Sequence, residues 1–183
     1  MNDETARSWG IDDIVIGSSA RSWLNRKNLL PSKWGLDQYH AEKIKNANIR
    51  LTLMYSPASV LSLAPNPLDG LAEVRLVVID ANAFEHPKLT REENIATMLH
   101  EIGHVFDDMQ PKQSLVDALK AGNYNATTRS PVQRENAADD FAREAGFGQH
   151  IASSLRKFVE IHPEKFANAG IDERIRRMEA ETT

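Results

Sequence analysis

The residues best suited to chemistry in this chain are His100, Glu101 and His104, which form an HExxH motif. Two histidines four residues apart fall on the same face of a helix, so both imidazoles can reach one metal ion. Glu101 lies beside that face, where its carboxylate can accept a proton from a water molecule at the metal. The motif therefore predicts the working part of a zinc hydrolase.

A catalytic zinc site needs a third protein ligand, and the residues directly after the motif do not supply one. Where an extended HExxHxxGxxH motif has glycine and histidine, this chain has Asp107 and Gln110. The best source is a later segment in which Glu135 and Asp139 share a helix face. This spacing permits Glu135 to bind the metal while Asp139 accepts a hydrogen bond from the free ring nitrogen of a liganding histidine. An ordinary solvated pair of acidic side chains is the alternative.

The HExxH motif lies in a segment predicted to be one helix, over residues 90–109. Thr90 and Glu93 form a capping box ahead of apolar residues at helical spacing. Gly103 lies inside this helix, where glycine costs about 1 kcal/mol relative to alanine. This cost predicts the close approach of another backbone at Gly103.

The other predicted elements indicate an α+β protein. A small, mostly antiparallel sheet is expected before the motif helix, and a helical half after it. Strands are expected at 14–16, 49–55 and 71–80, and helices at 18–30, 37–46, 112–121, 131–145, 149–160 and 164–180. We interpret residues 1–183 as a single domain with its catalytic core at 72–146, while residues 1–70 carry no recognisable motif.

Composition narrows the classes of protein to which the chain can belong. Of its 183 residues, 41% are hydrophobic and 26% are charged, which is ordinary for a soluble globular protein. A net charge of −4 without a basic run argues against a nucleic-acid partner. The absence of cysteine excludes disulfides and thiolate zinc ligands. No apolar signal core or membrane-spanning stretch is present, so we expect a cytoplasmic protein without a membrane partner. The sequence does not predict an oligomeric state.

The two motifs together resemble those of the gluzincin metallopeptidases, in which HExxH is followed by a helix that bears ExxxD. More narrowly, Glu135, Ala138, Phe141 and Ala142 match the ExxAxxFA pattern of the ImmA/IrrE-type metallopeptidases. The similarity covers mainly residues 72–146. It implies a zincin-like domain that acts as a metalloendopeptidase on a protein or peptide substrate.

The same resemblance implies a role for each candidate residue. His100, His104 and Glu135 would hold a zinc ion, and Glu101 would be the general base. Asp139 would lie behind the ligands as a hydrogen-bond acceptor.

Two other functions compete with this one. A peptidase-like fold can serve as a non-catalytic binding or regulatory module, although every candidate catalytic residue is present. A structural zinc site is disfavoured, because such sites usually have four ligands and are rich in cysteine.

Asn82 and Ala83 are predicted to bind the substrate. Their Asn-Ala-Phe sequence resembles the substrate-binding edge strand of thermolysin-like peptidases, which would offer main-chain hydrogen bonds to an extended peptide. An ordinary exit from a strand into a loop is the alternative. Tyr124, His150 and His162 are candidates for holding the oxyanion of a tetrahedral intermediate, with a surface or partly buried polar role as the alternative for each.

Overall fold

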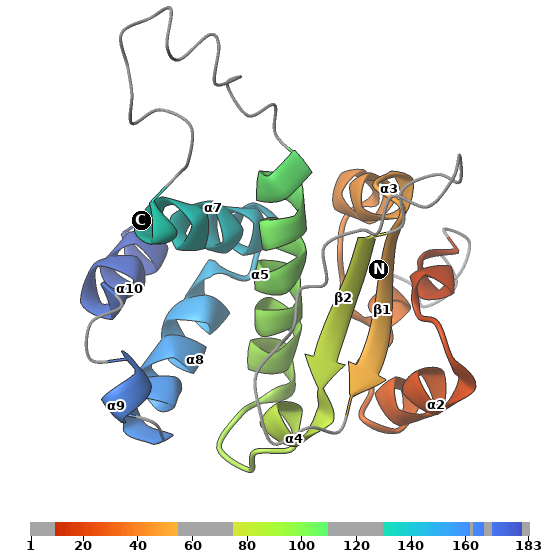
Figure 1. Ribbon diagram of the computed structural model, residues 1–183, viewed down its shortest axis with the longest axis horizontal. Coiled ribbons are helices and arrows are strands. Elements are labelled where there is room, and N and C mark those ends of the chain that lie inside the picture. The colour runs from red at the N-terminus through yellow and green to blue at the C-terminus, as the bar shows by residue number, and fades with distance from the viewer. Residues whose placement is uncertain (1–9, 55–74, 110–129, 162, 167–169, 181–183) are drawn as a thin grey trace, which may run out of the picture.

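One helix, α5 (Arg91–Met109), organises the structure (Figure 1). The computed structural model describes residues 10–54, 75–109, 130–161, 163–166 and 170–180. A two-stranded sheet lies on one side of α5, and the helices of the C-terminal half lie on the other. The protein therefore combines helices with a small sheet, as predicted, and the helices dominate.

The sheet consists of β1 (Ile49–Met54) and β2 (Arg75–Asp80), which pair in parallel. The antiparallel arrangement that the sequence predicted is therefore wrong for the described strands. Antiparallel neighbours are typically joined by a short turn, whereas parallel strands need a crossover of a dozen or more residues. The connection from 55 to 74 is long enough for a crossover. In addition, four consecutive residues of β2, from Val77 to Asp80, are buried, which is typical of a strand covered on both faces.

The N-terminal elements pack on β1 or on one another and build much of the hydrophobic core. They are η1 (Ile11–Ile14), α2 (Ser18–Arg26), η2 (Pro31–Lys33) and α3 (Gln38–Asn46). Trp23 and Trp34 are both buried in this core, as their size predicts. In place of the strand expected at 14–16, Val15 forms a single parallel bridge to Leu51.

The motif helix begins where its capping box predicts. The backbone N–H of Glu93 donates to Thr90 Oγ1 over 3.2 Å, and the backbone N–H of Thr90 donates to Glu93 Oε2 over 2.7 Å. The close approach predicted at Gly103 is also confirmed. A Cβ atom there would lie 2.7 Å from both the Cα and the carbonyl oxygen of Ala138, on helix α7 (Pro131–Glu144).

The C-terminal half continues through α7, α8 (Gly148–Ile161), α9 (Pro163–Phe166) and α10 (Ile171–Glu179). Ser130 caps α7 in a capping box with Gln133. The single helix expected at 164–180 is wrong, because α9 and α10 are separate. Gly170, directly before α10, has a φ of 61°, a left-handed conformation that interrupts a helix and favours glycine.

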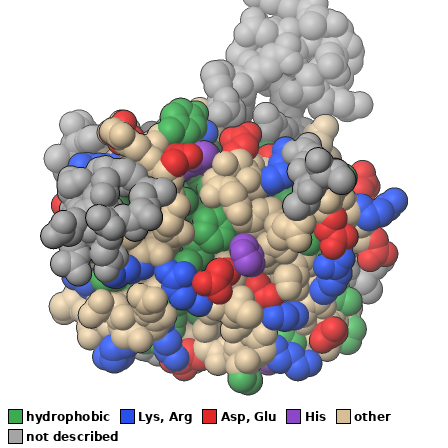
Figure 2. Space-filling model, turned by 180° about the vertical axis from the view of Figure 1, so that it is seen from behind, with side chains coloured by type: hydrophobic (Ala, Val, Ile, Leu, Met, Phe, Trp, Pro, Cys, Tyr) green, Lys and Arg blue, Asp and Glu red, His purple; other side chains and the backbone are tan. Residues whose placement is uncertain are grey.

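None of the described helices is both long enough and apolar enough to cross a membrane. On the face drawn in Figure 2, acidic and basic side chains of the described residues lie interspersed. The helix expected at 112–121, and with it the candidates Tyr124 and His162, lie outside the described residues.

Candidate metal centre and active site

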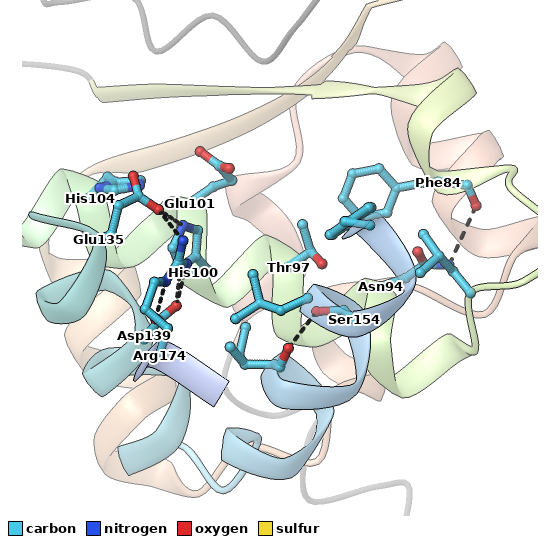
Figure 3. Close-up of a pocket in the computed structure, with 14 residues that line it drawn as sticks. Phe84, Asn94, Thr97, His100, Glu101, His104, Glu135, Asp139, Ser154 and Arg174 are labelled. Carbon is cyan, nitrogen blue, oxygen red and sulfur yellow. Dashed lines mark hydrogen bonds and ion pairs between the residues drawn. The ribbon is translucent and has the colours of Figure 1, made fainter. Parts of the chain in front are cut away.

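Three side chains from two helices converge on one point beside α5 (Figure 3). His100 and His104 project from α5, and Glu135 projects from α7. One ligand atom of each lies within 4.8 Å of the other two. The Nε2 atom of His100 lies 3.5 Å from one carboxylate oxygen of Glu135, and that of His104 lies 3.4 Å from the other. The sequence-predicted ligand set is thus brought together in space.

These separations suit a common metal ion better than direct hydrogen bonds. A charge-assisted N–H···O hydrogen bond spans about 2.7–2.9 Å, which is shorter than either separation. Zinc binds imidazole nitrogen and carboxylate oxygen at about 2.0–2.2 Å, which places tetrahedral ligand atoms about 3.3–3.5 Å apart. The donor set of His100, His104 and Glu135 therefore fits a zinc ion, and their ligand atoms lie close enough together to share one.

Asp139 lies directly behind one of these candidate ligands. Its Oδ1 atom is 2.8 Å from Nδ1 of His100, and the carboxylate is fully buried. A carboxylate at this distance accepts a hydrogen bond from Nδ1–H, which leaves Nε2 of His100 to face the other two candidate ligand atoms. The hydrogen bond predicted for Asp139 from its spacing is therefore present in the structure.

Arg174, on α10, completes the arrangement, and it was not predicted from the sequence. Its Nε and Nη2 atoms donate to the two oxygens of Asp139 over 2.7 and 2.8 Å. Its Nη1 atom lies 2.9 Å from Oε2 of Glu135. The guanidinium is buried and binds both carboxylates at once, so α10 helps to hold a proposed ligand and the support of another.

A signal for Arg174 exists in the sequence. Ile171, Arg174 and Met178 follow one another at helical spacing, and all three are buried on one face of α10. An arginine on the apolar face of an amphipathic helix must find a buried partner, because an unpaired buried charge is strongly destabilising. The sequence does not say which carboxylate that partner is.

The buried charges shift one another's pKa values. Burial alone would raise the pKa values of Glu135 and Asp139. His100, His104 and Arg174 outweigh burial at Glu135, and Arg174 and His100 outweigh it at Asp139, so that both pKa values are lowered. Burial alone would lower the pKa of His100, but Asp139 and Glu135 outweigh it and raise this pKa to about 9. The site therefore stabilises positive charge at the position where a cation would bind.

Glu101 lines the same cavity as the three candidate ligands. In Figure 3 its carboxylate lies on the side of His100 away from Asp139 and Arg174. This is the side left free by the supporting hydrogen bonds. The position is consistent with a group that handles protons beside a metal rather than one that supports a ligand.

Asn82 and Ala83 do not lie on an edge strand, contrary to the prediction. The strand β2 ends at Asp80, and the next residues form the short helix α4 (Ala81–Phe84). A helical turn uses main-chain groups that an edge strand would offer to a peptide, so the proposed strand template is absent at these two residues. Their neighbour Phe84 does line the cavity. Another oxyanion candidate, His150, lies at the start of α8 and is not among the residues that line the cavity.

Comparison of the chain with models of protein families, with curated protein sequences and with solved structures gave no match.

Proposed function

We propose that the protein is a zinc-dependent peptidase whose metal ion is held by His100, His104 and Glu135. The observation that carries this proposal is the convergence of three ligand atoms in a cavity that Glu101 also lines. Two imidazoles and one carboxylate are a typical donor set of catalytic zinc sites, which leave one position open. Peptide hydrolysis is the reaction that the sequence resemblance to gluzincin and ImmA/IrrE-type metallopeptidases favours.

Each residue then has a distinct task. A zinc ion at this site would lower the pKa of a water molecule and polarise the carbonyl of the substrate. Glu101 accepts the proton of the attacking water and delivers it to the leaving amine. Asp139 holds His100 in the tautomer that presents Nε2. Arg174 fixes the carboxylates of both Asp139 and Glu135.

Metal analysis tests the ligand set directly. Purified protein should contain about one zinc ion per chain, and His100→Ala or Glu135→Ala should lose most of it, because each change removes one of three ligands. Glu144→Ala on the same helix α7 is a matched control that should keep its zinc. Full zinc retention in Glu135→Ala would contradict the assignment of this ligand.

A Glu101→Gln change tests the reaction. The variant should keep its fold and zinc but lose peptide cleavage by about 10²–10⁴-fold, because an amide cannot accept the proton. Cleavage of a peptide library by mass spectrometry measures the loss. Glu92→Gln, the same change near the start of α5, should cleave as fast as the wild type.

The competing function predicts a different result in the same assays. Wild-type protein that binds stoichiometric zinc but cleaves no peptide in the library contradicts the peptidase proposal. That outcome would favour a binding or regulatory module built on a peptidase-like site.

A further inference from the structure

The cavity at the candidate metal centre continues along α5 toward the start of that helix (Figure 3). Its volume is about 280 Å³. Among the described residues, every charged side chain that lines it belongs to the metal centre. The continuation suits an uncharged, apolar group of a bound molecule. Its apolar lining comes from three parts of the chain: Phe84 on α4, Leu89 on the connection to α5, and Ile151, Leu155 and Phe158 on α8.

Two polar residues of this continuation direct their hydroxyl protons into the protein. The hydroxyl of Thr97 donates to the carbonyl oxygen of Glu93 over 2.9 Å. That of Ser154 donates to the carbonyl oxygen of Ile151, also over 2.9 Å. A hydroxyl that is bonded in this way to the preceding turn of its own helix has no proton left for a ligand. The walls are therefore more apolar than their residue types indicate.

Phe84 is placed to limit the size of a group that enters this part of the cavity. It is buried, and in Figure 3 its ring points toward Thr97 and the metal centre. The helix that carries it, α4, has only four residues. So short a helix is not stable by itself, so the position of the ring depends on contacts with other elements.

Contacts with two longer helices hold the end of α4. Asn94 on α5 donates through Nδ2 to the carbonyl oxygen of Phe84 over 3.4 Å. The next residue, Glu85, accepts a hydrogen bond at Oε1 from Nε1 of Trp23 on α2 over 3.2 Å, and Nζ of Lys27 lies 3.6 Å from the same oxygen. Trp23 is only 2% exposed, and a buried indole N–H needs an acceptor. Glu85 therefore ties the wall formed by Phe84 to the N-terminal core.

We propose that this part of the cavity receives a large apolar side chain of the substrate next to the cleaved bond, that Phe84 sets which side chains fit, and that Glu85 and Trp23 position Phe84. Leucine and phenylalanine would bury apolar surface against these walls. Lysine and glutamate would lose hydration without a charged partner in this part. The inference rests on the proposed function and adds the substrate class. It also gives α2, in the part of the chain without a recognisable motif, a role in selecting the substrate.

Matched peptides that differ only beside the cleaved bond test the substrate class. Those with leucine or phenylalanine there should have a kcat/KM about tenfold to a hundredfold above those with alanine, because the larger side chains bury more apolar surface. Lysine and glutamate peptides should fall below alanine peptides. Each residue is tested on both sides of the bond. An alanine or lysine peptide that is cleaved as fast as the leucine peptide at both positions would overturn the proposal.

Removing the ring of Phe84 tests whether it limits size. Phe84→Ala should raise the ratio of kcat/KM for tryptophan over leucine peptides about tenfold, because the larger side chain gains room while the smaller one loses a wall. A general loss of stability would lower both values together and leave the ratio unchanged. Phe147→Ala is the matched control, because Phe147 also packs on the core but does not line the cavity. An unchanged ratio in Phe84→Ala would contradict the role of Phe84.

Glu85 is partly exposed, so its replacement tests the positioning role without opening the core. Glu85→Ala should shift the same ratio in the same direction as Phe84→Ala, by about threefold or more, because a hydrogen bond that holds α4 is lost. Glu85→Gln should restore the wild-type ratio, since its amide oxygen can still accept from Trp23. Glu160→Ala, which breaks only an exposed pair with Lys88, is the control. A wild-type ratio in Glu85→Ala would contradict the positioning role.

A binding measurement separates this proposal from the proposed function. N-acetyl-leucinamide can enter the apolar part of the cavity without hydrolysis and without a metal. In an NMR titration of the wild-type protein it should shift the methyl signals of Ile151 and Leu155, whereas N-acetyl-lysinamide should not. Such shifts without any peptide cleavage would sink the peptidase proposal but support the apolar pocket. Peptide cleavage without a preference for leucine over alanine would do the reverse.

Discussion

Two buried clusters of charged side chains lie along α5, and they differ in whether their polar atoms are satisfied within the protein. Near the start of the helix, the carboxylate of Glu93 accepts hydrogen bonds from the backbone of Thr90, from the hydroxyl of Ser153 and from the ammonium of Lys157. Near its end, the ligand atoms of His100, His104 and Glu135 face one another at distances too long for good hydrogen bonds.

The difference separates a stabilising cluster from the proposed metal site. Burial would raise the pKa of Glu93, but its three donors outweigh burial and lower this pKa, so the cluster is complete in itself. The cluster around Glu135 is equally well supported from behind, by Asp139 and Arg174, but its candidate ligand atoms converge on a shared point. Buried support for side chains that converge on one point is typical of a preorganised binding site.

The largest effect is expected from Arg174→Met, which leaves the buried carboxylates of Asp139 and Glu135 without their cation. Removing one partner of a buried ion pair typically costs about 3–5 kcal/mol. Chemical denaturation of the metal-free protein should show a loss of this size, and zinc affinity should also change. Arg177→Met is the matched control, because Arg177 also lies on α10 but pairs with the half-buried Asp140 of α7. Equal losses in the two variants would mean that Arg174 has no special place at the site.

The next largest effect separates the two clusters. Glu93→Ala should lower the free energy of unfolding by about 2–4 kcal/mol, because it removes a cap and leaves Lys157 without its partner. Lys157 is partly exposed and can turn toward water, which keeps the loss below that of Arg174→Met. The same variant should retain one zinc ion per chain. Loss of zinc from a folded Glu93→Ala protein would show that the two clusters are not independent.

Asp139→Asn should weaken zinc binding by about 10–100-fold, the usual effect of losing a carboxylate behind a liganding histidine. Competition with a chromophoric chelator measures this affinity. Asp140→Asn, at the adjacent position of α7, should leave the affinity unchanged. If Asp139→Asn loses zinc as completely as His104→Ala, then Asp139 is itself a ligand and Glu135 is not the third one.

Local features of the two motif helices could be predicted from the sequence, because they depend on residues close together in the chain. The capping boxes at Thr90 and Ser130 and the spacing of the HExxH motif are of this kind. The close approach at Gly103 could be predicted as well, because glycine inside a helix needs a reason. The contact at Gly103 lies between the helix that carries the histidines and the helix that carries Glu135 and Asp139. Predicting this contact therefore also predicts that the four side chains lie close together.

Features that depend on distant parts of the chain could not be predicted. The parallel pairing of β1 and β2 depends on the path of the twenty residues between them, 55–74, and strand patterns do not reveal that path. Arg174 reaches Asp139 across 35 positions, and only the fold brings them together. The break at Gly170 depends on a backbone conformation that glycine permits but does not require.

The last expected effect is the dependence of zinc binding on pH, about tenfold per pH unit, and it follows from the pKa of His100. Burial alone would lower this pKa, but Asp139 and Glu135 raise it to about 9, so the ring stays protonated where a free histidine would be neutral. Zinc must displace this proton, because only the deprotonated Nε2 can bind it. Affinity should therefore rise about tenfold per pH unit between pH 7 and pH 9 and level off above that range. Chelator competition across this range measures the slope.

In Asp139→Asn, one cause of the raised pKa is gone, so the plateau should begin at a lower pH. An affinity that is flat from pH 7 to pH 9 in the wild-type protein would mean that His100 is already neutral, and that the cluster does not hold positive charge at its centre.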